Sequence, residues 1–400
     1  MPATLHEDAA PYSKRNSAVA VTWSALTCDG SDFEVKMLHH TEVRPKDAPR
    51  DTSRLAWEEF FKEMDALAEG KRQDGTPVAK DEDGTEWGVI LLFGKGDMEQ
   101  LVKWGHRDYG ARGKICSACD GDKTDMPFTD LRSNAKWRPT VNVSNAVYMS
   151  RIDRGHPVAD SHYFNKYFLR YDSMHIMDLN GVTSVAAGST IMRIVRHDRD
   201  LGANQQLRLD AINAQMKAFQ KRQKPSAKMP PLRLKDLDSG DGWDQLAGNL
   251  IKAGNTRNLA PFVEHLVRTR FTDPTDAFGK DIVRFTSAVN DVYEAMYERD
   301  MFLSDPAKEK LRTALHEMGK AHMLCRAHAN RAHECAFQVK PKAHYAQHLY
   351  MQSRLVNSRE TQCYQEESMM GVLANIYKRT CKGPYRATVQ AAVCMKCLVA

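Results

Sequence analysis

The stretch WGVILLFGKGDMEQLVKWG, Trp87–Gly105, decides the fold that we expect. Its first part, Trp87–Phe93, is a short unbroken apolar run, which is typical of a strand buried in the middle of a sheet. We expect the strand to end at Gly94 and Gly96. Asp97 follows at once, where it can cap the helix that comes next. An acid directly after a buried strand predicts a carboxylate at the edge of a sheet.

Two strands and a helix are expected before this stretch. In Ser17–Leu26 apolar residues recur at every second position, as they do in a half-buried strand. A turn at Asp29-Gly30 and a second alternating run, Phe33–Met37, complete an antiparallel hairpin. Residues Ser53–Gly70 carry an apolar stripe at helical spacing, which predicts an amphipathic helix that ends at a glycine.

The second half of the chain is predicted to be helical. Helical periodicity runs from about Ser184 to Val339. Within that region we expect helices over Ser184–Val195, Leu246–Ile251, Leu259–Val267, Ile282–Met296 and Ala307–Ala336. A final helix is expected over Ser358–Arg379, because Asn357 and Glu360 are spaced like a capping box. The pattern predicts an α/β core with a large all-helical insertion.

The composition is that of a folded protein without membrane segments. The chain has 400 residues, of which 42% are hydrophobic, and this suffices for a sizeable core. No stretch approaches the roughly 18 to 20 apolar residues of a membrane-spanning helix, so we expect no membrane partner. The opening MPATLHEDAA has neither the basic start nor the apolar run of a signal peptide. The nine cysteines are therefore expected to be reduced thiols or metal ligands.

The balance of charge suits a polyanionic partner. The formal net charge is +6 and the isoelectric point is near 8.7, which lowers the cost of approaching phosphates. Basic residues gather in Lys217–Lys235, where lysines and prolines alternate without apolar periodicity. We interpret that segment as a solvated loop in preference to a DNA contact.

Cys116 and Cys119 have the spacing of half a zinc site, because two thiolates on a tight turn can reach one tetrahedral ion. The missing ligands could be His106, His162 or His175, and the sequence does not choose among them. A cysteine pair at the end of the chain has the same spacing, and we attribute it to chance.

A second stretch rich in cysteine and histidine, CRAHANRAHEC, spans Cys325–Cys335. On one continuous helix Cys325 and His328 share a face, whereas His333 and Cys335 rotate away from it. Four ligands cannot converge from such a helix, so we expect surface and core residues there.

Several short segments resemble eukaryotic cut-and-paste transposases, most closely the CACTA (En/Spm-like) group and related transposon-derived sequences. The string YDSMHIMDLNGV, Tyr171–Val182, is similar to the aspartate-x-x-histidine motif of that family. Three further regions resemble, in order, its first-aspartate segment, its second acid with helix and cysteine pair, and its late Pro-x-x-His stretch with the closing helix. They read LHEDAAPYSKRNSAVAVTWSAL (Leu5–Leu26), GDMEQLVKWG with KICSAC (Gly96–Cys119), and KPKAHYAQHL with YQEESMMG (Lys340–Gly371).

The resemblance implies a ribonuclease H-like mixed sheet with a catalytic trio of Asp8, Asp97 and Glu367. Glu366 stands beside Glu367, so the third acid is assigned to within one residue. Three carboxylates with open positions suit Mg²⁺ or Mn²⁺, which assist in-line attack on a phosphodiester. By the same resemblance Asp172 and His175 support the site, or His175 joins the cysteine pair on zinc.

The leading expectation is a nuclear DNA transposase that cleaves transposon ends and transfers them to target DNA, with a homo-oligomer as one expected assembly. Residues 1–182 form the first part of the core, 183–339 the helical insertion, 340–385 the closing helix and 386–400 a tail. Two alternatives remain. One is a domesticated or decayed transposase that binds DNA without catalysis, and the other is a nuclease acting on RNA hybrids.

Overall fold

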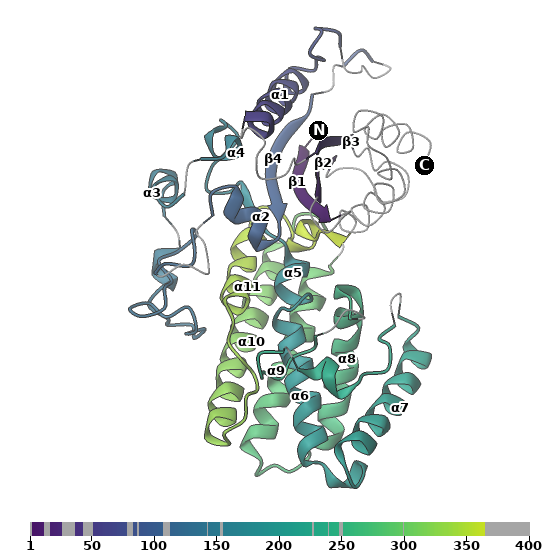
Figure 1. Ribbon diagram of the computed structural model, residues 1–400. Coiled ribbons are helices and arrows are strands. Elements are labelled where there is room, and N and C mark those ends of the chain that lie inside the picture. The colour runs from purple at the N-terminus through teal and green to yellow at the C-terminus, as the bar shows by residue number, and fades with distance from the viewer. Residues whose placement is uncertain are drawn as a thin grey trace. The chain divides into compact units, whose positions relative to one another are not determined.

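The computed structural model describes thirteen stretches of the chain. They are residues 2–11, 17–25, 37–42, 51–77, 83–85, 88–106, 113–141, 143–152, 155–225, 228–238, 240–247, 251–298 and 300–364. The chain divides into two compact units (Figure 1). Unit 1 contains the described residues within 1–107, 144–171 and 363–400, and unit 2 contains those within 108–143 and 172–362. These divisions lie elsewhere than the expected boundaries at 182 and 339.

Unit 1 is built on a five-stranded mixed sheet with the strand order β3-β2-β1-β4-β5. The strands are β1 (Pro2–Pro11), β2 (Ser17–Ala25), β3 (Met37–Glu42), β4 (Ile90–Gly96) and β5 (Leu169–Tyr171). The pairs β1–β2 and β2–β3 are antiparallel, whereas β1–β4 and β4–β5 are parallel. Parallel neighbours need long crossovers, and the chain supplies them between β3 and β4 and between β4 and β5. The expected α/β class is confirmed.

The predicted hairpin is present, with a shift in its second strand. β2 begins at Ser17 as expected and pairs antiparallel with β3. β3 starts at Met37, where the predicted strand ended. The predicted range Phe33–Lys36 and the turn at Asp29-Gly30 lie outside the described residues.

The buried strand lies three residues later than predicted, because β4 runs through Gly94 and Gly96 instead of ending before them. A Cβ atom at Gly94 would lie 2.6 Å from the ring of Trp104 and 2.9 Å from that of Phe168. Glycine therefore allows two aromatic side chains to pack directly against the strand. The prediction that the strand ends at Gly94 was wrong for this reason, whereas Gly96 is the last residue of β4.

Four helices of unit 1 lie in the part of the chain that the structure describes. They are α1 (Asp51–Ala68), α2 (Met98–Lys103), α3 (Asn145–Ser150) and α4 (Pro157–Asp160). The predicted amphipathic helix corresponds to α1, which buries Trp57, Phe60 and Met64 at helical spacing. Its prediction is confirmed.

Unit 2 is mostly helical. Its α-helices are α5 (Ser173–Met177), α6 (Val182–His197), α7 (Gln205–Gln223), α8 (Ala253–Arg270), α9 (Ala277–Met296), α10 (Asp305–Arg331) and α11 (Pro341–Gln352). Short 3₁₀ turns are η1 (Arg138–Thr140), η2 (Arg199–Leu201), η3 (Leu234–Leu237) and η4 (Ser358–Thr361). Helices α6, α8, α9 and α10 confirm four of the predicted segments.

Three predicted helical segments differ from the structure or lie outside its description. Helix α10 ends at Arg331, since His333 has a left-handed backbone, so the predicted extension to Ala336 is wrong. Leu246 lies in an extended segment, where its amide donates to the carbonyl of Ser184. Of the predicted final helix, η4 and Tyr364 are described, and residues 365–400 lie outside the described part of the chain.

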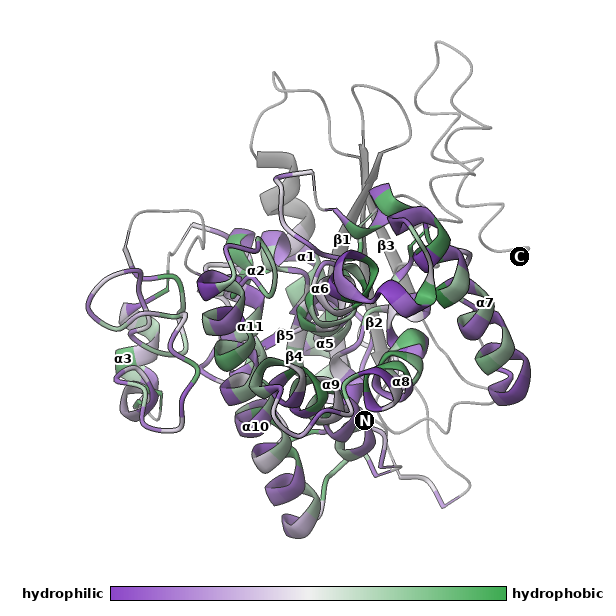
Figure 2. Ribbon diagram, turned by 90° about the horizontal axis from the view of Figure 1, so that it is seen from below, coloured by the Kyte–Doolittle hydropathy of each residue, from purple (hydrophilic) through white to green (hydrophobic). Residues whose placement is uncertain are grey.

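Helix α6 lies at the centre of unit 2 and contacts α7, α8, α9 and α11 (Figure 2). Every residue from Gly181 to Thr190 is buried, and most of them are small. A Cβ atom on Gly188 would overlap the backbone of Gln245 and Leu246, so glycine is needed where the extended segment crosses the helix. Ser189 fixes this crossing by donating to the carbonyl of Asp244 at 2.7 Å.

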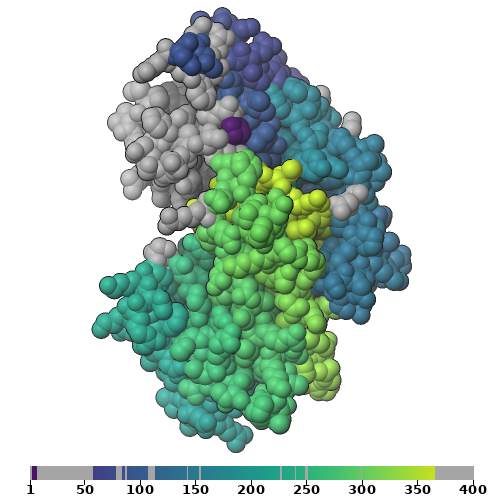
Figure 3. All heavy atoms as spheres, turned by 180° about the vertical axis from the view of Figure 1, so that it is seen from behind, coloured from purple at the N-terminus to yellow at the C-terminus, as the bar shows by residue number. Residues whose placement is uncertain are grey.

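The outer helices complete unit 2. Figure 3 shows the green spheres of the later helices of unit 2 beside yellow-green ones from further along the chain, and helices α10 and α11 contact each other. A search of the described helices found none with the length and apolar character that crossing a membrane requires.

Candidate metal centre

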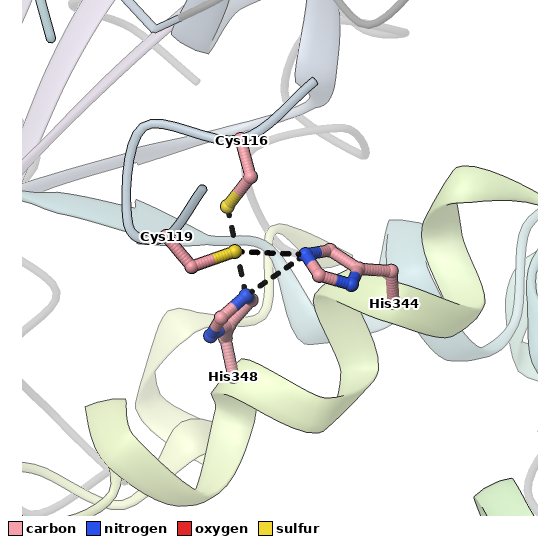
Figure 4. Close-up of side chains that lie close together, drawn as sticks. All are labelled: Cys116, Cys119, His344 and His348. Carbon is pink, nitrogen blue, oxygen red and sulfur yellow. Dashed lines mark hydrogen bonds between the residues drawn. The ribbon is translucent and has the colours of Figure 1, made fainter. Parts of the chain in front are cut away.

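Four side chains that can bind a metal come together in unit 2. Cys116, Cys119, His344 and His348 each offer one ligand atom, and these four atoms all lie within 4.8 Å of one another. The two cysteines come from a loop and the two histidines from one helix, and all four point toward a common centre (Figure 4). All are buried, with at most 2% of any of them exposed. The cluster can bind a metal ion such as zinc.

Helix α11 places the two histidines. Residues four apart on an α-helix lie on the same face, one turn above the other, so His344 and His348 are directed to the same point. Pro341 occupies the first turn, where its missing N–H costs nothing. Tyr345, on the same helix, donates to the carbonyl of Ile115 at 2.7 Å and so holds the cysteine loop against α11.

The cysteine loop is closed by backbone contacts on both sides. The amide of Ile115 donates to the carbonyl of Gly121 at 3.0 Å, and the amide of Gly121 donates to Sγ of Cys119 at 3.3 Å. A Cβ atom at Gly121 would lie 2.9 Å from the ring of His344. Glycine is therefore required for the loop to approach the histidines.

The distances fit a tetrahedral zinc ion. Zn–S bonds of about 2.3 Å and Zn–N bonds of about 2.0 to 2.1 Å separate tetrahedral S and N ligands by about 3.5 Å, and two N ligands by about 3.3 Å. Sγ of Cys119 lies 3.3 Å from Nε2 of His344, and Sγ of Cys116 lies 3.5 Å from Nε2 of His348. The two Nε2 atoms are 3.1 Å apart. With a zinc ion bound, two sulfur and two nitrogen ligands at this spacing would form a closed structural site.

The surroundings favour uncharged imidazole ligands. Burial lowers the pKa of His344 to about 4, an effect that outweighs the hydrogen bond with Cys116. A histidine must be neutral to bind a metal, so at neutral pH His344 is ready to do so. The ring of Trp137 lies 4.4 Å from that of His344 and covers this side of the cluster.

Arg138 contributes a cation close to the cluster. Burial lowers its pKa to about 10, and Cys119 and Asp130 oppose that shift. Its guanidinium group donates to Oε1 of Gln347 on α11 at 2.7 Å and lies over the ring of Trp137. Arg138 therefore links η1, which follows the cysteine loop in the chain, to helix α11.

The three histidines that the sequence suggested as zinc ligands do not belong to this cluster in the described part of the chain. His106 contacts the hydroxyl of Tyr171 at 3.0 Å, and His162 is largely exposed beside Asp65. His175 lies on α5, where its Nδ1 is hydrogen-bonded to the carboxylate of Asp172. The ligands that converge with the cysteine pair are instead His344 and His348.

The second Cys/His stretch forms no such cluster within the described residues. His328 on α10 pairs with Asp281 at 3.2 Å, and Cys325 is buried in the core. The interpretation of these two residues as surface and core positions agrees with the structure.

The predicted catalytic acids lie on different elements. Asp8 is within β1, and Asp97 is the N-cap of α2, where Oδ1 accepts from the amide of Gln100 at 2.7 Å. Asp172 caps α5 and is buried. Glu367, with its neighbour Glu366, lies outside the described residues.

The sequence contains a signal for the two histidines. In the segment KPKAHYAQHL, the His-x-x-x-His spacing on a helix is that of paired metal ligands. Combined with Cys116 and Cys119, it completes a Cys₂His₂ set.

The chain was compared with models of protein families and with curated proteins. A scan against models of protein families found no match, and a comparison with curated proteins found none either.

Proposed function

We propose that this chain is a metal-dependent enzyme that cleaves DNA phosphodiester bonds, with unit 1 as a ribonuclease H-like domain of the transposase type. The proposal depends on the sheet of unit 1 and on two aspartates, one within β1 and one directly after the neighbouring strand β4. The zinc-type cluster of unit 2 is part of the scaffold in this account, because four protein ligands leave no open position for a substrate.

The topology of the sheet supports the fold assignment. Three antiparallel strands, in the order β3-β2-β1, continue into two parallel ones, β4 and β5. This order and these directions are those of a ribonuclease H-like sheet. Helix α1 lies between β3 and β4 in the chain, and α2 follows β4.

One observation carries the functional proposal: Asp8 lies within β1, and Asp97 directly follows the adjacent parallel strand β4. His6 on β1 is the partner of Lys95 on β4, and each aspartate follows its partnered residue by two positions. Continuing this register places the backbone of Asp8 beside that of Asp97. A pair of aspartates on neighbouring segments of a sheet suits a divalent cation, because Mg²⁺ is commonly bound through one or two carboxylates.

Asp97 keeps part of its carboxylate available. Oδ1 accepts the amide of Gln100 and caps α2, whereas Oδ2 makes no hydrogen bond with the residues that the structure describes. A capping aspartate is held in one orientation, so its second oxygen is presented in a fixed direction. Asp97 can therefore stabilise the helix and bind a cation at the same time.

The remaining assignments rest on the resemblance. Asp8, Asp97 and Glu367 would hold Mg²⁺ or Mn²⁺. When bound, such ions stabilise charge on phosphoryl oxygens and lower the pKa of a bound water. Asp172 orients His175 through its hydrogen bond, which leaves Nε2 of the ring as the group that meets other partners. The mildly basic chain would lower the cost of binding DNA.

The test is cleavage of supercoiled and linear DNA by the purified chain in Mg²⁺ or Mn²⁺, compared with Asp97→Asn. Asparagine is as good an N-cap as aspartate, so the variant keeps α2 but lacks a charged metal ligand. Asp276→Asn is the matched control, because Asp276 caps α9 in the same way, accepting from Gly279 at 2.9 Å. We expect metal-dependent cleavage in the parent chain and Asp276→Asn, and its loss in Asp97→Asn.

Two results would contradict the proposal. Equal cleavage by Asp97→Asn would remove that residue from the chemistry. DNA binding that is salt-sensitive, independent of magnesium and without cleavage would replace the enzyme by the noncatalytic DNA-binding alternative.

A further inference from the structure

The C-terminal half of α7 carries a row of exposed lysines. Lys217, Lys221 and Lys224 fall at positions i, i+4 and i+7, and residues at this spacing lie on the same side of an α-helix. The stripe that packs α7 onto unit 2 is a separate one and contains Leu209 and Ile212. The row therefore faces solvent on a helix at the outer edge of unit 2 (Figure 1).

This arrangement differs from the sequence-based interpretation of the basic segment. A solvated loop was expected over Lys217–Lys235 in preference to a DNA contact, but α7 continues through the first part of it to Gln223. The helix aligns cations that a loop would leave scattered.

The segment after α7 runs back along the helix. Nε2 of Gln220 donates to the carbonyl of Met229 at 3.3 Å, and Nδ2 of Asn213 donates to the carbonyl of Leu232 at 2.9 Å. Met229 and Leu232 are buried, so this segment is packed onto unit 2. It places the exposed side chain of Lys228 beside the helix that carries the lysine row.

One asparagine holds Lys228 next to a lysine of α8. Oδ1 of Asn255 accepts from the backbone amide of Lys252 at 3.2 Å, and its Nδ2 donates to the carbonyl of Lys228 at 2.5 Å. Both lysines are exposed. We use the name α7 surface for the exposed cations of these three segments, which are Lys217, Lys221, Arg222, Lys224, Lys228 and Lys252.

No carboxylate neutralises the α7 surface within the described part of the chain. The sequence from Ala211 to Lys235 contains neither aspartate nor glutamate. None of the six cations forms an ion pair with a described residue, whereas exposed cations of α9 and α10 such as Arg284 and Lys310 lie within 4.0 Å of a carboxylate. Clustered charge of one sign without internal partners attracts an external polyanion.

The helix itself explains only part of this charge. Cations in the last turn interact favourably with the helix dipole, and Lys221 and Arg222 lie there. Lys217 lies before that turn. Lys224 has a left-handed backbone with φ of 49°, where helices usually have glycine. Stability of α7 therefore does not account for lysine at these two positions.

The absence of apolar side chains favours a nucleic acid over a membrane. Helices that bind membranes expose large apolar residues beside their cations. No large apolar side chain of the described residues is exposed between positions 208 and 301. The row from Lys217 to Lys224 is about 10 Å long, which matches about three phosphates along one strand of duplex DNA.

We propose that the α7 surface binds the phosphate backbone of duplex DNA. Contacts of this kind position DNA without reading its sequence. The surface belongs to unit 2 and is separate from the aspartates to which cleavage is assigned. The choice of DNA over RNA rests on the proposed function, whereas the binding of a phosphodiester backbone does not.

The test is fluorescence anisotropy of a short labelled DNA duplex with the full chain, over a range of salt concentrations and without added Mg²⁺ or Mn²⁺. The main variant combines Lys217→Gln, Lys221→Gln and Lys224→Gln, because glutamine forms helices about as well as lysine. At about 0.1 M salt we expect it to bind about tenfold or more weakly than the parent chain. The slope of log affinity against log salt should fall by about 2 to 3, since each phosphate contact contributes about 0.9.

A matched control removes the same charge elsewhere in unit 2. It combines Lys280→Gln, Lys310→Gln and Lys320→Gln, three exposed lysines of α9 and α10, and should keep the affinity and slope of the parent chain. A second variant, Lys228→Gln with Lys252→Gln, tests the surface without altering α7 and should lower the slope by about 2. Thermal melting shows that each variant is folded.

Three results would overturn the proposal: no salt-sensitive binding by the parent chain, a parent-like slope in both α7-surface variants, or equal weakening in the control. Tighter binding of duplex RNA than of duplex DNA would overturn the choice of DNA. The outcome is distinguishable from that of the cleavage assay. Binding that depends on the α7 surface without any cleavage supports this surface and contradicts the enzyme, and cleavage without such binding does the reverse.

Discussion

Sγ of Cys119 lies 3.3 Å from Nε2 of His344, although 225 residues separate them in the sequence. The cysteine loop and helix α11 therefore meet only in the folded unit 2. A metal held by both segments binds the folded chain and not the unfolded one, so its binding free energy contributes to folding.

The first prediction concerns this metal. The purified chain should contain a single tightly held zinc ion, and His348→Ala should remove it and lower the free energy of unfolding by several kcal/mol, because structural zinc contributes to folding outright. Elemental analysis and thermal melting measure both effects. Cys335→Ser alters an exposed cysteine and should change neither. Full zinc content in His348→Ala would exclude the site.

A second prediction concerns the crossing at α6. Gly188→Ala should lower the free energy of unfolding by about 1 to 3 kcal/mol, because the added Cβ overlaps the backbone of Gln245 and Leu246. Gly155→Ala is the matched control, since a Cβ at Gly155 meets no atom within 4 Å. Denaturant unfolding compares the two, and equal stability would show that the extended segment does not press against α6.

A third prediction separates the two roles of Asp97. Asp97→Ala should cost about 1 kcal/mol of stability through the lost cap of α2, whereas Asp97→Asn should cost almost none. Urea unfolding monitored in unit 1 measures this difference. If both variants unfold alike, the capping bond contributes nothing and cannot be what orients the carboxylate.

A fourth prediction concerns His322, a buried histidine of α10. Burial lowers the pKa of His322 to about 4, from an ordinary value of 6.5. Between these values the unfolded chain binds more protons than the folded one, so stability falls as the pH drops from 6.5 to 4. His322→Phe should remove up to about 3 kcal/mol of that fall. Unfolding curves at pH 7.5 and pH 4.5 test it, and an unchanged pH dependence would contradict it.

Local pattern was enough to predict much of the fold. The apolar run before Asp97 predicted β4, and the acid itself proved to cap α2. Period-two and helical spacing predicted β2 and α1. The strand was predicted to end too early because glycine at position 94 is required by tertiary packing, which local sequence does not show. The ring of Trp104, after α2, and the ring of Phe168, far along the chain, both pack against Gly94.

The sequence predicted two of the four ligands of the metal centre. Spacing within one turn marks Cys116 and Cys119, but the choice of partner depends on which histidines the fold brings to that turn. His344 and His348 come from the far end of the chain.

The most direct test of the central claim is Mn²⁺ binding to the zinc-loaded chain, followed by electron paramagnetic resonance. The account predicts saturable binding of Mn²⁺ to the parent chain and to Asp276→Asn, and its loss or marked weakening in Asp97→Asn with the melting temperature unchanged. Identical Mn²⁺ binding in Asp97→Asn and the parent chain would contradict it.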